Sequence, residues 1–537
     1  MYAQYSKDFN EKHHFDIMGG YEWQHFHREG NSYYAGYYPS TTVLVDDKGA
    51  SLAGKPYSPT GSDWATENFL VSFFGRANYT LLDRYMLTAT VRYDGSSRFS
   101  KDNRWAIFPS FALGWKIKEE AFLKDVEWLS DMKLRLGYGI TGQQNIGSDY
   151  PTLASFTQNK DYAYYPIIGN GITYRPSAYN TDLKWEETTT YNVGLDFGMF
   201  NGRIDGSIEF YDTDTKDVLY SRSLPATGGQ FNAKNPYQMV ANIARMHNRG
   251  VELTLNTRNI VTKNFTWTST LTFAYNKEQV KSIDLGSNTS VDDLVSLGLF
   301  MGQPKSTIFG LKKIGIWQKG EEADAAVFGL APGDVKIQSR LEKQSEGVWT
   351  LTDEDGTVTE YTAENPYAIG AEDRIIYGQG SPKTTWGFNN TFVWKNFDLN
   401  VFITARWGHM INGALLGNFK DGTKNMPAFY NYWTEDNPTN DYPRPYLSRS
   451  TDYSDPTSSL SVVDGSYWKV KNITLGYTLP KKLPSKINMS RARVYATVHN
   501  PFIFTKSHLL EDVDPETGAD DSFPMYKQIV FGVNVSF

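Results

Sequence analysis

The amino-acid sequence predicts an all-β protein, a transmembrane antiparallel β-barrel, and three observations support this fold class. Long segments alternate apolar and polar residues with a period of two, as strands with one apolar face do. No run of 18 apolar residues occurs, so a transmembrane helix is not expected. Short and long connections between these segments alternate, which is typical of strands that cross a membrane and return.

In the first half of the chain, the alternation predicts eight strands and one helix. Residues 2–9 and 14–26 are expected to pair around a short turn, and residues 191–199 and 204–210 form the clearest hairpin. The other predicted strands are residues 69–79, 85–93, 105–115 and 132–140. A short helix is expected at residues 119–131.

In the second half, the same alternation continues to the last residue. The predicted strands are residues 251–255, 265–275, 386–394, 397–403, 473–479, 494–498 and 529–537. Residues 280–381 are either one very long loop or a loop that contains two more strands, one of them at 307–311. The expected count is therefore about 15 strands, or 17 with those two.

The connections predict which side of a membrane each end of the strands faces. Short turns are expected at 81–84, 200–202, 261–264 and 395–396. Long polar and aromatic segments are expected at 28–67, 144–183, 221–246, 412–464 and 506–523. Membrane barrels place short turns on the periplasmic side and long loops outside, so we expect the same here. A soluble sandwich fits less well, because the strands run to nine residues or more and their second face carries ionised side chains.

The last strand carries the pattern most clearly. Ile529, Phe531, Val533, Val535 and Phe537 fall on one face, and ten residues are enough for a tilted strand to cross a bilayer. The terminal aromatic residue resembles the end of bacterial outer-membrane barrels, in which the last strand is the recognition signal for the assembly machinery. The alternative is an ordinary edge strand of a soluble protein.

The composition of the chain excludes some kinds of ligand and some kinds of site. The net charge of −7 disfavours nucleic acid, and the absence of cysteine excludes disulfides and cysteine-ligated metal centres. Aromatic residues make up 15% of the chain, which suggests interface girdles or sugar-contacting surfaces. Residues 1–9 do not form a signal peptide, so either the chain begins partway through a longer protein or the membrane assignment is wrong.

Several stretches carry more specific patterns than alternation alone: residues 83–99 (DRYMLTATVRYDGSSRF), 134–143 (LRLGYGITGQ), 183–186 (LKWE), 248–253 (NRGVEL) and 465–477 (GSYWKVKNITLGY). These stretches resemble the SusC-like (RagA-like) TonB-dependent transporters of Bacteroidetes. The similarity runs through the whole chain in order. It implies a 22-stranded barrel of which residues 1–537 are the carboxy-terminal part, with the plug and the amino-terminal domain absent.

The resemblance also implies function and partners. We expect import of oligomeric nutrients across the outer membrane, with glycans as the first choice and peptides as the second. A SusD-like lipoprotein would cover the barrel as a lid, and TonB–ExbB–ExbD would supply energy through the missing plug. The alternatives are a passive porin-like barrel and a soluble β-rich adhesin or carbohydrate-binding module.

Aromatic residues in the long loops are the candidate substrate contacts, because flat rings stack on sugars or peptide side chains. These candidates are Tyr162, Tyr164, Tyr165, Tyr174, Tyr430, Tyr432, Trp433 and Tyr442. The alternative is that such loops pack on one another or on the lid protein.

No catalytic motif, cofactor site or metal site is expected. His13, His14, His25 and His27 are interpreted as surface histidines, because no carboxylate stands at a matching spacing in the sequence. Residues 353–356 (DEDG) are too short for a calcium loop and predict a hairpin turn.

Overall fold

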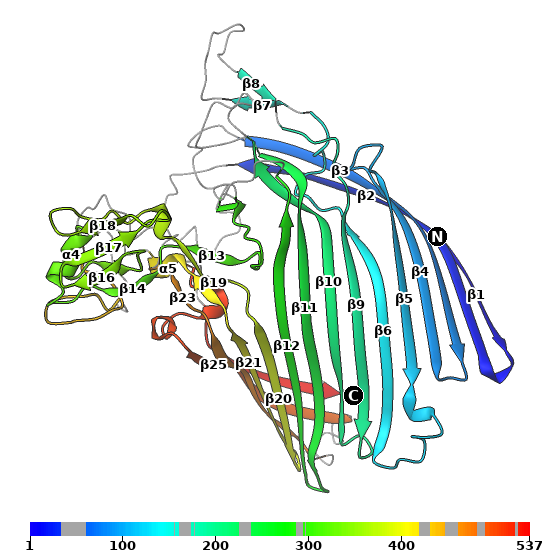
Figure 1. Ribbon diagram of the computed structural model, residues 1–537. Coiled ribbons are helices and arrows are strands. Elements are labelled where there is room, and N and C mark those ends of the chain that lie inside the picture. The colour runs from blue at the N-terminus through cyan, green and yellow to red at the C-terminus, as the bar shows by residue number, and fades with distance from the viewer. Residues whose placement is uncertain are drawn as a thin grey trace.

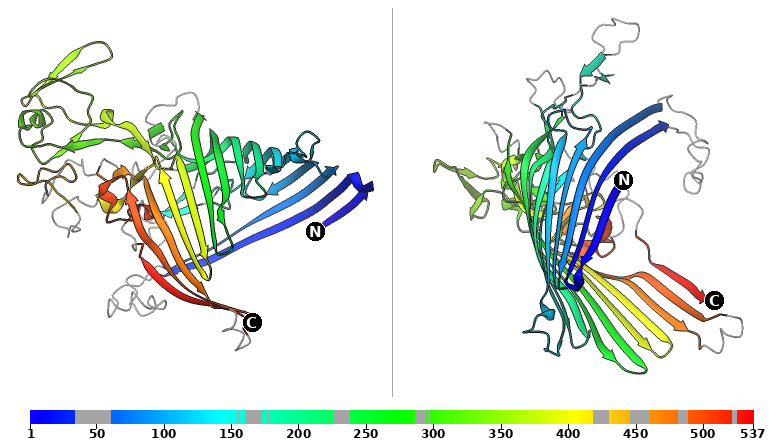
Figure 2. Two further views of the ribbon diagram at one scale, coloured as in Figure 1. Left: turned by 90° about the horizontal axis from the view of Figure 1, so that it is seen from below. Right: turned by 90° about the vertical axis from the view of Figure 1, so that its right-hand side faces the viewer.

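The computed structural model describes most of the chain. The described residues are 1–33, 61–154, 156–159, 173–176, 178–224, 238–285, 294–295, 297–417, 430–445, 460–480, 489–520 and 525–537. Within them, the dominant feature is one antiparallel sheet of 15 strands, in which each strand pairs with the next strand of that sheet along the chain (Figure 1). The sheet curves strongly, and its first and last strands form its two edges (Figure 2).

The 15 strands include every barrel strand expected from the alternation. They are β1 (Tyr2–Phe9), β2 (His13–Tyr33), β3 (Gly61–Leu81), β4 (Tyr85–Ser96), β5 (Trp105–Lys116), β6 (Leu129–Gln143), β9 (Glu186–Met199), β10 (Ile204–Ser223), β11 (Gln238–Val261), β12 (Phe265–Ile283), β20 (Thr384–Trp394), β21 (Phe397–Trp407), β24 (Tyr467–Thr478), β25 (Arg491–Thr505) and β26 (Gln528–Ser536). No helix in the described part of the chain has the length and apolar character needed to cross a bilayer.

The two faces of the sheet differ in chemistry as predicted. One face exposes apolar side chains along its whole width, among them Phe73, Val91, Ile107, Leu113, Leu136, Val193, Ile208, Phe388, Leu475 and Phe531. The other face carries ion pairs between neighbouring strands. Arg135 donates to Asp196 at 2.9 Å and to Glu209 at 3.1 Å, and Arg92 donates to Glu22 at 2.8 Å. A sheet that is apolar on one side and ionic on the other matches the wall of a membrane barrel.

Aromatic pairs mark both margins of the apolar face. Tyr85 stacks on Trp115 and Trp394 on Phe397 near the end of the sheet with short turns, called here the short-turn end. Pairs near the opposite, long-loop end are Tyr93–Trp105, Phe273–Trp386 and Trp468–Phe504. Two aromatic bands with an apolar zone between them are the girdles of a membrane-spanning sheet.

The short turns lie where the sequence predicts them and depend on left-handed backbone conformations. Leu82 and Asp83 have positive φ between β3 and β4, and Phe200 and Asn201 do so between β9 and β10. Lys395, with φ of 52°, turns the chain between β20 and β21. These turns and the β1–β2 turn all lie at the short-turn end of the sheet, because neighbouring strands run in opposite directions.

The helix expected at residues 119–131 is wrong. The segment forms a 3-10 helix, η2 (Ile117–Glu119), followed by turns, and β6 begins at Leu129. The ammonium of Lys118 donates to the carbonyls of Leu123, Lys124 and Val126 at 2.8–3.0 Å and so stabilises these turns. A short helix without tertiary contacts is only marginally stable in water, so three hydrogen bonds to one cation are enough to favour the turns.

Residues 284–383 are one long connection without a further strand of the main sheet, among the residues described. The segment expected as a strand at 307–311 becomes β13 (Thr307–Gly310), which pairs only with β19 (Ile375–Gln379). Four residues are too few to cross a bilayer. The rest comprises α4 (Glu322–Val327) and the strands β14 (Lys313–Ile316), β15 (Val335–Ile337), β16 (Glu342–Ser345), β17 (Val348–Thr352) and β18 (Val358–Tyr361). The predicted turn at residues 353–356 joins β17 to β18, which confirms the hairpin.

Candidate functional site

The long-loop end holds a packed group of connections, called here the loop assembly. It contains the described parts of residues 284–383, 408–466 and 506–527, and it extends beyond the ends of β20 and β21 (Figure 1). Its core is apolar and joins segments far apart in sequence. One buried cluster unites Ile316 and Val335 with Trp433, and another unites Ile411 with Leu510. The loops are therefore a folded unit that can present side chains in fixed positions.

Three of the predicted substrate contacts lie inside the loop assembly. Trp433 is 6% exposed and its Nε1 donates to Oε1 of Gln318 at 2.9 Å. Tyr442 is 1% exposed and packs against Tyr430 with ring centroids 4.3 Å apart and planes tilted by 30°. The Tyr430 hydroxyl donates to the carbonyl of Leu415. In this arrangement these three rings are buried and pack on the loops themselves, and substrate contact by them stays a prediction.

The remaining predicted contacts are distributed differently. Tyr432 is 38% exposed, in contrast to the buried Tyr430, Trp433 and Tyr442. Tyr174 lies in β8 (Thr173–Pro176), which pairs with β7 (Phe156–Asn159). Tyr162, Tyr164 and Tyr165 lie outside the described residues. Substrate contact by these five residues stays a prediction.

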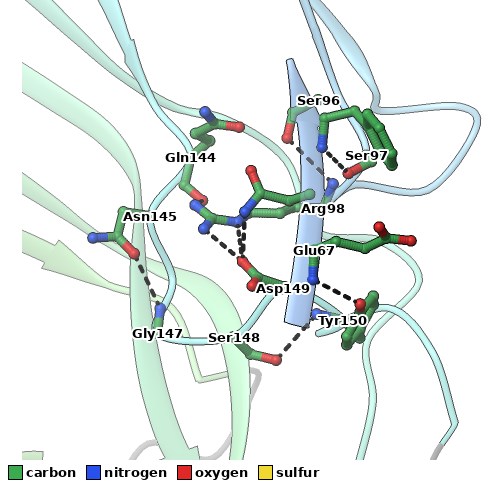
Figure 3. Close-up of polar contacts among 12 residues, drawn as sticks. Glu67, Ser96, Ser97, Arg98, Gln144, Asn145, Gly147, Ser148, Asp149 and Tyr150 are labelled. Carbon is green, nitrogen blue, oxygen red and sulfur yellow. Dashed lines mark hydrogen bonds and ion pairs between the residues drawn. The ribbon is translucent and has the colours of Figure 1, made fainter. Parts of the chain in front are cut away.

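A polar strap, residues 144–150, fixes the base of the loop that carries those tyrosines (Figure 3). Arg98, just after β4, donates from Nη2 to Oδ1 of Asp149 at 2.6 Å and from Nη1 to the carbonyl of Gln144 at 3.3 Å. The hydroxyl of Tyr150 accepts a hydrogen bond from the backbone N–H of Glu67 on β3 at 2.9 Å. Burial raises the pKa of Asp149, but hydrogen bonds from Thr66 and Arg98 outweigh it and lower the pKa below its usual value. The strap therefore holds a carboxylate ionised at the rim.

A second polar cluster clamps the last long connection onto the sheet. The side chain of Lys469 on β24 is 1% exposed, and its Nζ donates to Asp514 at 2.5 Å and to Glu516 at 2.9 Å. Lys471 donates to the same Glu516 at 2.6 Å. Burial raises the pKa of Glu516, but the hydrogen bonds from Lys471 and Lys469 outweigh burial and lower the pKa below its ordinary value of 4.5.

A pocket of about 300 Å³ opens at the base of the loop assembly. Its lining includes Gln303, Tyr377, Lys383, His409 and Asp464. The Tyr377 hydroxyl and Nδ1 of His409 are buried and have no hydrogen-bond partner among the described residues. Burial raises the pKa of Tyr377 to about 12, and burial together with Arg406 lowers the pKa of His409.

Sequence reasoning missed the polar residues that organise the loops. Asn440 accepts the backbone N–H of Ile316 at 2.9 Å, and Lys313 is buried beside Asp441, with burial lowering its pKa to about 8. A single sequence offers no pattern that separates such residues from solvated ones, because their partners lie more than 100 positions away.

Comparisons with known proteins decide the family. The family model described as TonB dependent receptor-like, beta-barrel matches residues 1–500. The chain belongs to this family. Its relatives are receptors and transporters, and like them it is a protein of the outer membrane. The predicted SusC-like resemblance and the barrel fold are confirmed.

Individual relatives sharpen this placement. The TonB-dependent receptor SusC of Bacteroides thetaiotaomicron is 37% identical over 546 residues, an alignment that covers 100% of this chain and 50% of SusC. The TonB-dependent receptor P3 of Formosa agariphila is 31% identical over 567 residues, covering 100% of this chain and 52% of P3. The solved structure of the RagAB peptide transporter matches with a TM-score of 0.74 and 25% identity, over 100% of this chain and 55% of that one. The chain thus spans about half the length of the curated relatives it matches.

Proposed function

We propose that this chain forms the carboxy-terminal barrel part of an outer-membrane transporter that imports oligomeric nutrients with energy supplied through TonB. The observation that carries the proposal is the 37% identity with the TonB-dependent receptor SusC over the whole chain. The substrate would be a glycan in the first place, with peptides as the alternative that the match to the RagAB peptide transporter supports. The protein would catalyse no reaction of its own.

The proposed partners follow from the same relatives and from the loop assembly. A SusD-like lipoprotein would sit as a lid on the long-loop end, and TonB–ExbB–ExbD would act from the side of the short turns. The exposed ring of Tyr432 would contact the substrate or the lid, together with Tyr162, Tyr164, Tyr165 and Tyr174 from the loop after the polar strap. Loops with their own cores suit this role, since they hold such rings in place.

Energy dependence separates the proposal from a passive porin. Cells that produce the protein are given fluorescent oligosaccharides or peptides of graded length, in strains with and without TonB. We expect uptake to fall to background without TonB, whereas a passive pore would keep its uptake. Recovery of the protein from membranes without detergent would instead support a soluble module and contradict the proposal.

Tyr432 gives a test at the level of one residue. Replacing it by alanine removes a stacking surface worth about 0.5–1.5 kcal/mol, so substrate or lid binding should weaken several-fold. Binding is measured on the purified protein with and without its lipoprotein. Trp394→Ala is the matched control, because Trp394 is an exposed aromatic residue at the opposite, short-turn end. Unchanged binding in Tyr432→Ala would remove this residue from the site.

A further inference from the structure

The structure assigns a divalent transition-metal site to His25, His27 and Glu67 on the apolar side of the β2–β3 hairpin. The three residues offer one ligand atom each, and these atoms all lie within 4.8 Å of one another. Zn²⁺ is the metal that two imidazoles and a carboxylate suit best among those common in proteins.

The register of the hairpin brings the three side chains together. His25 and His27 are two residues apart on β2, so their side chains point to the same face. Glu67 on β3 stands directly opposite His27, and its Oε2 lies 3.2 Å from Nε2 of His25. The sequence alone hides this carboxylate, because it lies 40 positions after His27 and only the strand pairing places it beside the histidines.

The geometry needs little adjustment to bind a metal. Ligand atoms around a tetrahedral Zn²⁺ lie about 3.4 Å apart, given metal–ligand bonds of about 2.0–2.2 Å. A separation of at most 4.8 Å closes to that value through small side-chain rotations. His25 is already oriented, since its ring stacks on Phe69 with centroids 4.4 Å apart and planes 11° from parallel. Glu29, whose carboxylate is 3.5 Å from Nε2 of His27, is available as a further ligand or hydrogen-bond acceptor.

The position of the site is also informative. It lies on the same face as the exposed Trp23 and farther along β2 toward the long-loop end. Above an aromatic band, side chains leave the hydrocarbon zone and meet water. All three ligand residues are exposed, so a metal ion from outside the cell reaches them, and water fills the remaining coordination position. A bound ion would cross-link β2 to β3 above the membrane surface.

Zn²⁺ binding to the purified protein tests the assignment. The protein is kept in detergent, carries a tag without histidine, is freed of metal and is titrated with Zn²⁺ alone. We expect one Zn²⁺ per chain from this site, with an affinity at least about tenfold lower in His27→Ala and in Glu67→Gln. His14→Ala is the control, because His14 is an exposed histidine that pairs with Asp8 near the short-turn end. An equal affinity in wild type and in the double variant His25→Ala/His27→Ala, or an equal loss in His14→Ala, would overturn the proposal.

A second measurement needs no variant and so does not depend on variants folding. Diethyl pyrocarbonate modifies accessible imidazoles, and mass spectrometry reads each histidine separately. Zn²⁺ should protect His25 and His27 from modification and leave His14 unprotected. Equal modification of His25 and His27 with and without Zn²⁺ would refute the site even in a correctly folded protein.

Discussion

Two tyrosines in the loop assembly have buried hydroxyls that differ in whether they have hydrogen-bond partners. The Tyr367 hydroxyl lies 3.0 Å from Oδ1 and 3.1 Å from Oδ2 of Asp373, to which it donates. The Tyr377 hydroxyl has no such partner among the described residues and lines the pocket beside His409. A buried polar group without a partner costs about 1–3 kcal/mol, whereas a satisfied one stabilises the fold.

Replacing each tyrosine by phenylalanine should therefore change the free energy of unfolding differently. Tyr367→Phe leaves a buried carboxylate with one donor fewer, and we expect it to destabilise the loop assembly by about 1–2 kcal/mol. Tyr377→Phe removes an unpaired hydroxyl, so the free energy of unfolding should stay within about 0.5 kcal/mol of wild type or rise. Urea unfolding followed by tryptophan fluorescence measures both. A similar loss in the two variants would show that Tyr377 has a partner after all.

At the scale of single elements, the polar strap depends on Arg98. Replacing Arg98 by alanine leaves Asp149, whose side chain is 10% exposed, without its main cation. We expect this change to destabilise the strap by about 2–3 kcal/mol and to speed hydrogen exchange across residues 144–154. Arg245→Ala is the control, because Arg245 is largely exposed in its pair with Asp214 and should cost less than about 1 kcal/mol. Equal exchange in both variants would exclude the strap as an anchor.

The connection between β25 and β26 should loosen in acid. Glu516 has a lowered pKa in the folded protein, so its contribution is present above its ordinary value of 4.5 and is lost as pH falls through the lower folded value. Hydrogen exchange of residues 506–519, corrected for the intrinsic rate, should accelerate below about pH 4. Glu516→Gln should show the loosened state already at pH 7. An exchange rate independent of pH in wild type would contradict this role.

How much of each element the sequence predicts depends on what its residues face. The middle of each strand alternates because one face meets lipid, and those segments were predicted correctly. The strand ends were not: β11 runs from Gln238 to Val261, but its sequence pattern covers only residues 251–255. Above the lipid the strands no longer keep one apolar face. There Val218, Ile243 and Val280 are buried together, and backbone pairing continues without a regular alternation. The same reason shortens the loops expected at 28–67 and 221–246.

The sequence does not predict which of the candidate aromatic residues are exposed. Aromatic content alone does not distinguish a ring that binds a ligand from one that fills a core. Tyr432 and Trp433 are neighbours in sequence, yet the first is exposed and the second packs against Ile316 and Leu460. Their difference depends on contacts with residues 311–337, which no local pattern encodes.

For the whole molecule, the terminal residue offers a test of assembly. The side chain of Phe537 is 86% exposed and follows β26, the edge strand of the sheet. We predict that Phe537→Ser lowers the amount of folded protein in the outer membrane several-fold, because the terminal aromatic residue is the expected recognition element. Phe531→Ser is the control, since Phe531 is 80% exposed on the same strand and face. Heat-dependent gel mobility reports the folded fraction, and equal losses would show that only lipid contact matters.

The pairing of β12 with β20 shows how a sheet can tolerate a long insertion. Closing an unfolded loop of roughly 100 residues costs on the order of 4 kcal/mol in chain entropy. Residues 284–383 have their own hydrophobic core, and the β13–β19 pair together with the bond from the Gly380 N–H to the Ser306 carbonyl at 2.7 Å draws their two ends together. If this segment folds first, its own contacts offset most of the entropy cost of closing the loop. Pairing of β20 with β12 then costs about as much as closing a short turn. The length of that segment can then vary among relatives with little effect on the stability of the membrane-spanning wall.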